Sequence, residues 1–174
     1  GPPYILHDQE YEDIALVFRT LEQFSLGPVT FVTVKDGQLA GAYMKNSGQY
    51  QILAPGNTYM LHSKDYENIE LVNRSDLFKL GPFYYITVRK NAVAGVYKKK
   101  GGEFVTLRHG STYQLNEEDF MSPISVKKDK HIVRCGPLTY LTVERGRLSG
   151  AYSVHTGEFV EFTDQDKEYI LHEM

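Results

Sequence analysis

The stretch "LGPVTFVTV", Leu26–Val34, decides the fold because the chain contains it three times. It returns as "LGPFYYITV" at Leu80–Val88 and as "CGPLTYLTV" at Cys135–Val143, so that the Gly-Pro pairs are spaced by 54 and 55 residues. The segments that follow each copy also match, through a recurrent glycine to a second turn and a second apolar run. Agreement in both position and residue type indicates an internal repeat.

The repeat period divides the chain into four segments. Residues 1–26 match the second half of a repeat, residues 27–80 and 81–135 are complete repeats, and residues 136–174 are a truncated repeat. The final residues begin another second half, so "YILH" at Tyr169–His172 duplicates "YILH" at Tyr4–His7. A closed three-fold ring would not need this overlap, whereas an open array cut at domain-sized points produces it.

The residue types favour strands throughout the chain. Each Gly-Pro precedes a run rich in β-branched and aromatic residues, bounded by turns such as "KDGQ" and "APGN". We therefore predict an all-β fold of tandem antiparallel β-sheet repeats of about 55 residues, arranged as an elongated array of small modules. The recurrent mid-strand glycines, Gly41, Gly95 and Gly150, predict a bulge or a close backbone approach.

Alternation along the strands predicts which side chains face the core. The pairs expected to face inward are Tyr59 and Leu61, Ile69 and Leu71, Ile14 and Leu16, and Ile124 and Val126. The acidic surroundings of the recurrent Tyr-x-Leu favour a core stripe over a nucleic-acid platform. Residues 8–24 also show the apolar spacing of a helix, but the equivalent segment of the middle repeat contains Pro123, which favours a strand.

The recurring histidines allow two interpretations. His7, His62 and His172 hold equivalent positions, which would suit a metal ligand or a catalytic base, but Asn116 replaces them in the middle repeat. Asparagine cannot exchange protons as histidine does, and an array separates equivalent positions by a whole repeat. We therefore expect these residues to cap strand ends through the nearby backbone, and we expect no metal and no cofactor.

Composition and charge argue against several classes of protein. The 174 residues carry a net charge of −3, which gives no general attraction to nucleic acid or anionic lipid. No apolar run approaches the ~20 residues that span a bilayer, so we expect no transmembrane segment. Cys135 is the only cysteine, which rules out an intrachain disulfide and predicts a cytoplasmic location.

The sequence also lacks the motifs of the common enzyme classes. It contains no GxSxG, no HExxH and no GxxxxGK[ST]. Cys135 stands where the other copies have Leu26 and Leu80, which is typical of a small buried hydrophobic residue and not of a nucleophile. We therefore predict that the chain is not an enzyme.

Two groups of lysines are the candidate partner-binding residues. They are Lys98, Lys99 and Lys100 beside a Gly-Gly turn, and Lys127, Lys128 and Lys130 in "KKDKH". Either group would suit phosphate groups or an acidic partner. On an acidic chain, solvated loops and strand edges protected by lysine are the alternative interpretation.

The repeats resemble the β-strand repeats in the N-terminal part of the major vault protein. The matching features are the three Gly-Pro entries and the passage "ILAPGNTYML" at Ile52–Leu61. The resemblance spans most of the chain as a pattern, although the Pro-Gly of this passage occurs in one copy alone. It implies a cytoplasmic scaffold whose repeats stack side by side.

Two functions remain open at this point. The first is a non-enzymatic scaffold module, vault-like, that supports self-assembly or binds protein partners, including further copies of itself. The second is a compact pseudo-three-fold β module, similar to a trefoil, that binds a sugar, a lipid or a partner peptide through its turns. They differ in whether the two ends of the chain pack together.

Overall fold

The computed structural model describes residues 12–13, 15–19, 21–164 and 167–173, and in these residues every regular element is a β-strand. All strand pairs are antiparallel, and the strands form small sheets in tandem, which confirms the predicted all-β array of small modules. The described residues contain no helix that would cross a membrane. The chain divides into two compact units, Gly1–Arg74 and Ser75–Met174.

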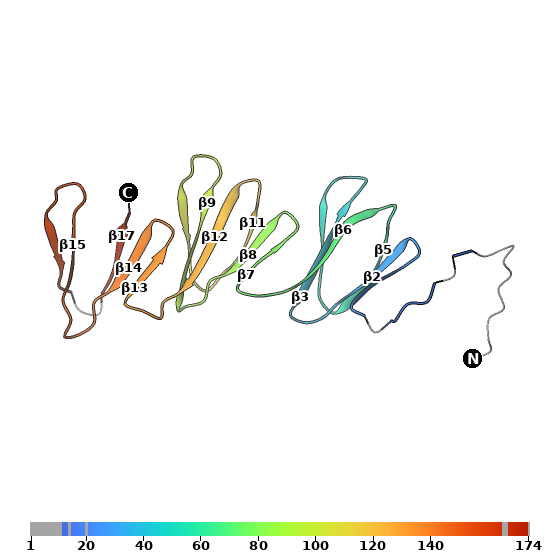
Figure 1. Ribbon diagram of the computed structural model, residues 1–174, viewed down its shortest axis with the longest axis horizontal. Helices are drawn as coiled ribbons and strands as arrows, with labels where there is room; N and C mark the ends of the chain where they lie inside the picture. Colours follow the sequence, from blue (N-terminus) through green and yellow to red (C-terminus); the bar gives the residue numbers. More distant parts are fainter. Residues whose placement is uncertain (1–11, 14, 20, 165–166, 174) are drawn as a thin grey trace. The chain divides into compact units, whose positions relative to one another are not determined.

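The first unit contains two three-stranded sheets (Figure 1). The first sheet has the order β1-β2-β5, with bounds Gln23–Leu26, Val29–Val34 and Asn57–His62. The second sheet has the order β4-β3-β6, with bounds Tyr50–Leu53, Gln38–Met44 and Tyr66–Asn73. The core lies between the two sheets, where Ile69 and Leu71 of β6 pack against buried residues such as Val32, Leu53 and Leu61.

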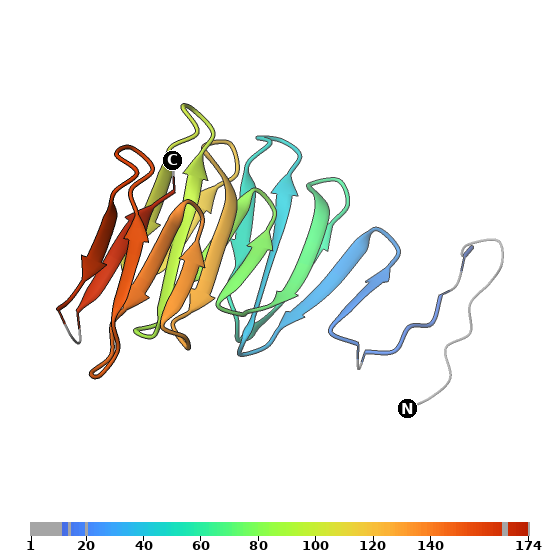
Figure 2. The ribbon, with the colours of Figure 1, turned by 60° about the vertical axis from the view of Figure 1, so that its left-hand side comes forward.

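The second unit repeats this arrangement once in full and once with a two-stranded second sheet (Figure 2). Its first two sheets are β11-β8-β7, with bounds Thr112–Asn116, Phe83–Thr87 and Leu77–Leu80, and β10-β9-β12, with bounds Phe104–Leu107, Ala92–Lys98 and Phe120–Lys127. The next two are β13-β14-β17, with bounds Ile132–Cys135, Leu138–Thr142 and Glu168–His172, and the two-stranded β15-β16, with bounds Ser149–Tyr152 and Phe159–Phe162.

The Gly-Pro pairs form the two-residue turns of hairpins. Leu26 pairs with Val29 across the first turn, and the equivalent residues pair across the other two. Gly27, Gly81 and Gly136 have φ of 58°, 52° and 58°, which fits the first central position of a type II′ turn and is adopted readily by glycine. The predicted role of Gly-Pro at a strand entry thus has a conformational cause.

The mid-strand glycines permit a close approach of an aromatic ring. A Cβ atom built on Gly41, Gly95 or Gly150 would lie 2.5, 2.3 or 2.4 Å from the ring of Tyr50, Phe104 or Phe159 on the paired strand. Each ring also meets a tyrosine edge-on, at centroid distances of 4.8, 4.9 and 5.0 Å. The predicted close approach thus occurs at all three glycines, and the predicted bulge also occurs in the strand paired with Gly41 and Gly95.

A β-bulge recurs in the long third strand of each complete repeat. The register of β6 against β3 and of β12 against β9 shifts at Asn68 and Ser122, which both have φ of 50°. Beyond the bulge, Glu70 lies opposite Gly41 and Ile124 lies opposite Gly95. These two residues therefore occupy equivalent positions in the two repeats.

This register corrects one prediction about the core. Ile124 and Val126 do face a core, but they lie on the opposite face of their sheet from the positions of Ile69 and Leu71. Pro123 takes the place of Ile69 directly after the bulge, where a strand tolerates proline. The middle sheet β10-β9-β12 consequently has apolar side chains on both faces and packs between two other sheets.

The first partial repeat departs from its prediction. Residues 15–18 form no strand, Leu16 is fully exposed at 100% and Phe18 is 79% exposed, so the inward position predicted for Leu16 is wrong. Ile14 and Tyr4–His7 lie outside the described residues. In the complete repeats, this segment is a strand because β3 or β9 lies beside it. No described strand pairs with residues 12–13 or 15–18.

Candidate interaction site

The two predicted groups of lysines do not form one site. Lys98 ends β9 and lies opposite Phe120, whereas Lys127 ends β12 and lies opposite Ala92. Because the strands are antiparallel, the groups lie at opposite ends of a six-residue span, about 20 Å apart at ~3.3 Å per residue. The two groups are therefore separate candidates, and partner binding by either of them stays a prediction.

The first group of lysines, Lys98 to Lys100, makes its contacts within and beside its own hairpin. The Lys98 ammonium lies 2.8 Å from the Glu103 carboxylate across the turn. The backbone amides of Lys98 and Lys99 donate to the carbonyls of Glu103 and Asp119. Lys99 and Lys100 are exposed at the hairpin tip, which agrees with the interpretation as a solvated turn.

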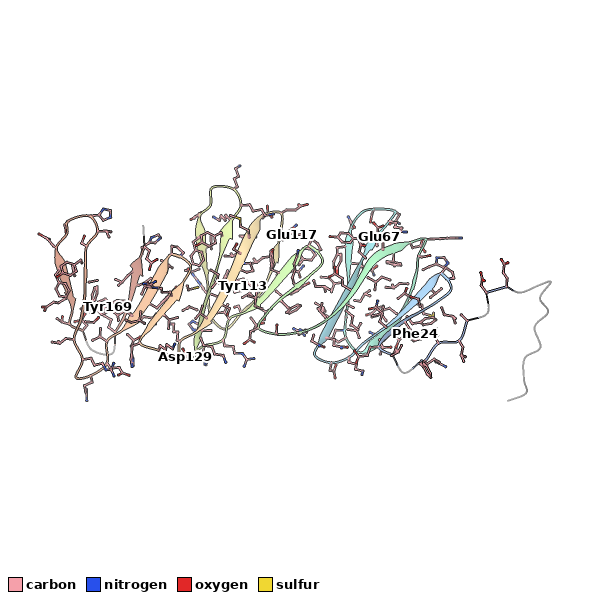
Figure 3. All side chains as sticks on the ribbon, in the orientation of Figure 1. Phe24, Glu67, Tyr113, Glu117, Asp129 and Tyr169 are labelled. Carbon is pink, nitrogen blue, oxygen red and sulfur yellow. The ribbon has the colours of Figure 1, made fainter. Side chains whose placement is uncertain are left out.

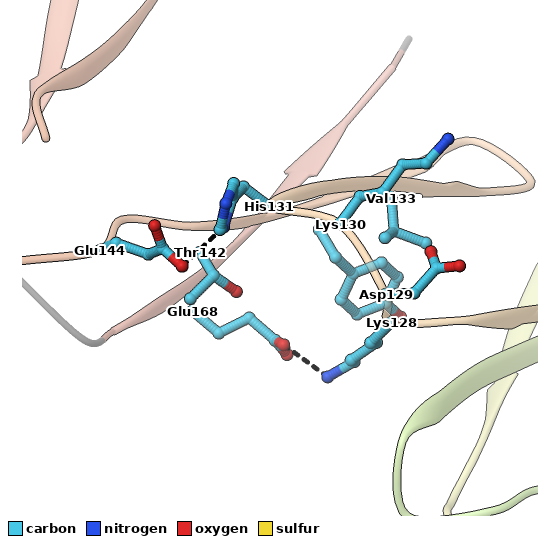
Figure 4. A pocket seen from close by; sticks show the side chains of 9 residues that line it. Lys128, Asp129, Lys130, His131, Val133, Thr142, Glu144 and Glu168 are labelled. Atoms are coloured by element: carbon cyan, nitrogen blue, oxygen red, sulfur yellow. Dashed lines mark hydrogen bonds and ion pairs between the residues drawn. The ribbon is translucent and has the colours of Figure 1, made fainter.

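The second group borders a small polar cavity of about 250 Å³ (Figure 4). Lys128 forms an ion pair with Glu168 of β17 and lies 5.4 Å from the ring centroid of Tyr140. The His131 Nδ1 atom lies 3.3 Å from Glu144 Oε1 on the same wall. Lys128 follows β12 and Glu168 belongs to β17, so this ion pair connects the segment after β12 to the next sheet. The cavity therefore lies at a structural junction.

The histidine positions behave as predicted in the two complete repeats. His62 Nδ1 accepts a hydrogen bond from the Lys64 amide at 3.1 Å, and Asn116 Oδ1 accepts one from the Glu118 amide at 3.0 Å. His172 Nδ1 lies 3.0 Å from the Glu173 carbonyl, and His7 lies outside the described residues. No group of three or more His, Cys, Asp or Glu side chains in the described residues is arranged to hold a metal ion.

The recurrent tyrosines have a second role that the sequence analysis missed. Tyr59 and Tyr113 donate a hydroxyl hydrogen bond to the carbonyls of Ala54 and Arg108, at 3.0 and 3.2 Å. The Tyr169 hydroxyl accepts a bond from the Asp164 amide at 3.1 Å (Tyr113 and Tyr169 in Figure 3). The hydrogen-bond partner always lies five residues before the tyrosine, in the preceding turn. This constant spacing was the sequence signal that could have predicted the bond. The rings of Tyr59 and Tyr113 pack against a core while their hydroxyls fix the turn.

Cys135 is a buried core residue. It is 1% exposed and packs with Val93, Val133 and Tyr140. Burial raises the pKa of its thiol to about 11, so the nucleophilic thiolate is a small fraction at neutral pH. Cys135 is therefore a packing residue, as the leucines at the equivalent positions of the other repeats predicted.

The strands β15 and β16, together called the terminal sheet, carry the most exposed apolar surface of the second unit. Leu148, just before β15, is 91% exposed, Tyr152 is 73% exposed and Phe159 is 53% exposed. The equivalents in the middle repeat are Val93, Tyr97 and Phe104. Val93 is buried, and both Val93 and Phe104 pack against β13 and β14. The same positions are therefore covered in one repeat and open in the next.

The other face of the terminal sheet borders an apolar cavity of about 690 Å³. Val160 and Phe162 line it from the sheet, and Ile170 and Leu171 line it from β17. In the first unit, the equivalent space between sheets holds side chains of β6, including Leu71. The terminal sheet thus has exposed apolar side chains on one face and an apolar cavity beside the other, which makes it the candidate interaction site.

Comparisons with protein-family models, with curated proteins and with solved structures find no match to this chain. The resemblance to the repeats of the major vault protein stays a prediction.

Proposed function

We propose that this chain is a non-enzymatic structural repeat protein whose modules support self-assembly or protein–protein interaction. The observation that carries the proposal is the stacking of sheets within the second unit, where β10-β9-β12 packs between two other sheets through apolar side chains on both faces. Repeat modules that stack in this way bury their cores against their neighbours. The exposed apolar side chains of the terminal sheet offer a surface of the same kind.

The chemistry of the terminal sheet suits a protein partner. Tyr152 and Phe159 are exposed aromatic residues, a type enriched at the centre of protein interfaces. The neighbouring cavity is wide, open and lined mainly by aliphatic and aromatic side chains. Burial of such surface contributes about 25 cal/mol per Å² of apolar area, from which the cost of association is subtracted.

The non-enzymatic part of the proposal rests on the sequence, which lacks catalytic motifs. A cytoplasmic location is proposed from the single cysteine and from the vault-like pattern. The partners proposed are proteins, including further copies of the chain.

Sedimentation or light scattering over a range of concentrations tests the proposal. We expect the average mass of the 174-residue chain to rise with concentration. Leu148→Asp should suppress this rise without lowering the melting temperature, because Leu148 is 91% exposed. Met121→Asp is the matched control, since Met121 of β12 is also an exposed apolar residue of the second unit but lies outside the terminal sheet.

Two results would contradict the proposal. A chain that stays monomeric at all concentrations and in mixtures with cell extract would remove the assembly role. Small-angle scattering of a compact monomer would instead favour the closed pseudo-three-fold module, in which residues 1–26 pack against residues 136–174.

A further inference from the structure

We infer that a cavity between two sheets of the second unit binds the phosphate group of a phosphate monoester, held by the side chains of Lys90 and Arg108. The cavity has a volume of about 260 Å³ and is lined by residues of the sheets β10-β9-β12 and β13-β14-β17, each of which has all three of its strands. It is separate from the terminal sheet, so phosphate binding goes beyond the proposed assembly role.

Three segments at the beginning of β9 bring cationic side chains to this cavity. The turn between β8 and β9 carries Lys90, and the turn between β10 and β11 carries Arg108 and His109. The third segment is the chain directly after β12, which carries Lys128. All four side chains are exposed, so a ligand from solution can reach them.

Backbone hydrogen bonds hold the three segments beside one another. The Gly110 amide donates to the Val88 carbonyl at 2.7 Å, which joins the two turns. The Lys128 amide donates to the Asn91 carbonyl at 2.7 Å, which joins the third segment to the first turn. The fold itself therefore gathers the cations at one cavity.

Two of these cations have no counterion. Lys128 forms an ion pair with Glu168 (Figure 4), the one carboxylate that lines the cavity among the described residues. The side chains of Lys90 and Arg108 form no ion pair and no hydrogen bond with any residue that the structure describes. The lining therefore carries an excess of two positive charges, although the whole chain has a net charge of −3.

The fold does not need these two cations. Asp36 and Ala54 hold the equivalent positions in the first repeat. The same hydrogen bond between the turns forms there, from the Gly56 amide to the Val34 carbonyl at 2.8 Å. The turns close with either set of side chains, so the positive charges of the middle repeat are available to a ligand.

The excess charge matches that of a phosphate monoester, which carries about −1.5 to −2 at pH 7. An arginine guanidinium donates two parallel hydrogen bonds to phosphate oxygens, and a lysine ammonium adds a further charged donor. His109 supplies one more ring N–H donor in the same lining. A lone carboxylate carries a single charge and would leave one of the two cations unpaired.

The size of the cavity favours a phosphorylated side chain of a protein partner as the source of this group. Its volume is below the roughly 300–1,000 Å³ of typical small-molecule pockets. Its lining also includes the buried, mostly small apolar residues Ala92, Val93 and Ala94. Such a cavity holds one side chain while the rest of the partner lies outside it. A free small phosphate is the other source of the same chemistry.

Amide chemical shifts of the 174-residue chain, measured by NMR, test this site. The probes are inorganic phosphate, a nucleoside monophosphate, and a phosphoserine peptide together with its unphosphorylated form. We expect saturable shifts in residues 89–91 and 108–111 with the three phosphate-bearing probes, and none with the unphosphorylated peptide. Sodium chloride at the same ionic strength controls for screening of surface charges.

The repeats supply variants that preserve the fold. Arg108→Ala and Lys90→Asp introduce the residue types of the first repeat, so the melting temperature should stay unchanged. Arg108→Ala should weaken phosphate binding about tenfold or more, as loss of a hydrogen bond to a charged group does, and Lys90→Asp should abolish it. Lys99→Asp is the matched control, because Lys99 is an exposed lysine just beyond the other end of β9, outside the cavity.

Each result supports or overturns the phosphate site. Tighter binding of the phosphopeptide than of the two small phosphates supports a phosphorylated protein partner, whereas equal binding supports the phosphate site and overturns that source. Absence of binding overturns the site. Shifts that chloride reproduces, or that Lys99→Asp reduces as much as Lys90→Asp, also overturn it, because they would reflect general charge. None of these results changes the concentration dependence of the mass, so failure here leaves the assembly role standing.

Discussion

His62 and Asn116 perform the same task with different side chains. Each accepts a hydrogen bond from the backbone amide two residues further along the chain. The task needs an acceptor at a fixed distance from the backbone, and it needs no proton transfer. This explains why the position tolerates exchange of histidine for asparagine between repeats.

Substitution of His62 tests this role. We expect His62→Asn to leave the free energy of unfolding nearly unchanged, because asparagine supplies the acceptor in the middle repeat. His62→Ala removes the acceptor and should cost about 0.5–1.5 kcal/mol, the typical net value of a hydrogen bond. Urea denaturation measures both. Equal losses for the two variants would show that the histidine acts through something other than this bond.

The burial of Cys135 determines how readily its thiol reacts. We expect its thiol to resist a thiol-reactive reagent at pH 8 in the native state and to react completely in denaturant, because it is 1% exposed. A fast native reaction would show that the sheet around it opens readily.

The raised pKa of Cys135 also predicts a dependence of stability on pH. The unfolded thiol ionises above its ordinary pKa of 9.0, while the folded thiol stays protonated up to about pH 11. The unfolded state therefore releases a proton first, and the free energy of unfolding falls as pH rises from 9 towards 11, by on the order of 2 kcal/mol. Cys135→Ala should lack this component, and the difference between the two unfolding curves measures it.

At the scale of elements, each glycine-bearing strand depends on its aromatic partner. The Phe104 ring covers Gly95 and also lies against Gly136 of the following hairpin. It thus stabilises its own sheet and the contact with the next. Phe159 covers Gly150 in the same way but is half exposed.

This difference predicts unequal costs for the same substitution. Gly95→Ala places a methyl group where the confined Phe104 ring lies, and we expect a loss of about 1–3 kcal/mol, typical of overpacking. Gly150→Ala should cost less because the Phe159 ring has room to turn outward. Thermal unfolding of the two variants provides the comparison. A larger loss for Gly150→Ala would contradict the confinement of Phe104.

Sequence comparison predicted the strands and turns well because each is encoded locally. β-branched runs, Gly-Pro turns and alternation recur in every copy, so one copy corrects a misleading pattern in another. The helical spacing of residues 8–24 illustrates this, since no helix forms in the described part of the segment. The capping role of His62 followed from the same comparison.

Other features depend on how the strands pair and which strands are neighbours, which comparison of the repeat sequences does not reveal. Ile124 lies opposite Gly95 as Glu70 lies opposite Gly41, so it faces away from the side of the sheet that carries Ile69 in the first repeat. The two lysine groups separate because β12 runs antiparallel to β9. Leu16 is exposed because a strand needs a neighbour as well as a suitable sequence. The candidate site was missed because the terminal sheet has an ordinary strand sequence, from which the exposure of its side chains cannot be predicted.

At the scale of the whole chain, stability should be uneven, because each sheet of a stacked repeat protein is stabilised mainly by its neighbours. The strand β9 has a hydrogen-bonded partner on each side and a sheet against each face. The terminal sheet is a two-stranded hairpin with exposed apolar side chains, an arrangement that is marginal in water by itself. The stability of β9 therefore depends on the stacked sheets around it, whereas the stability of the terminal sheet is that of a two-stranded hairpin.

Amide hydrogen exchange at low and high protein concentration would separate these contributions. In the dilute chain, we expect the amides of Ser149–Tyr152 to exchange much faster than those of Ala92–Lys98, because opening the terminal sheet breaks few contacts. When copies associate through the terminal sheet, exchange in Ser149–Tyr152 should slow. The amides of Ala92–Lys98 serve as the internal control, because their partners lie within one chain. Protection of Ser149–Tyr152 that is equal at both concentrations would mean that the terminal sheet is already complete in the single chain, and the assembly would then have to use another surface.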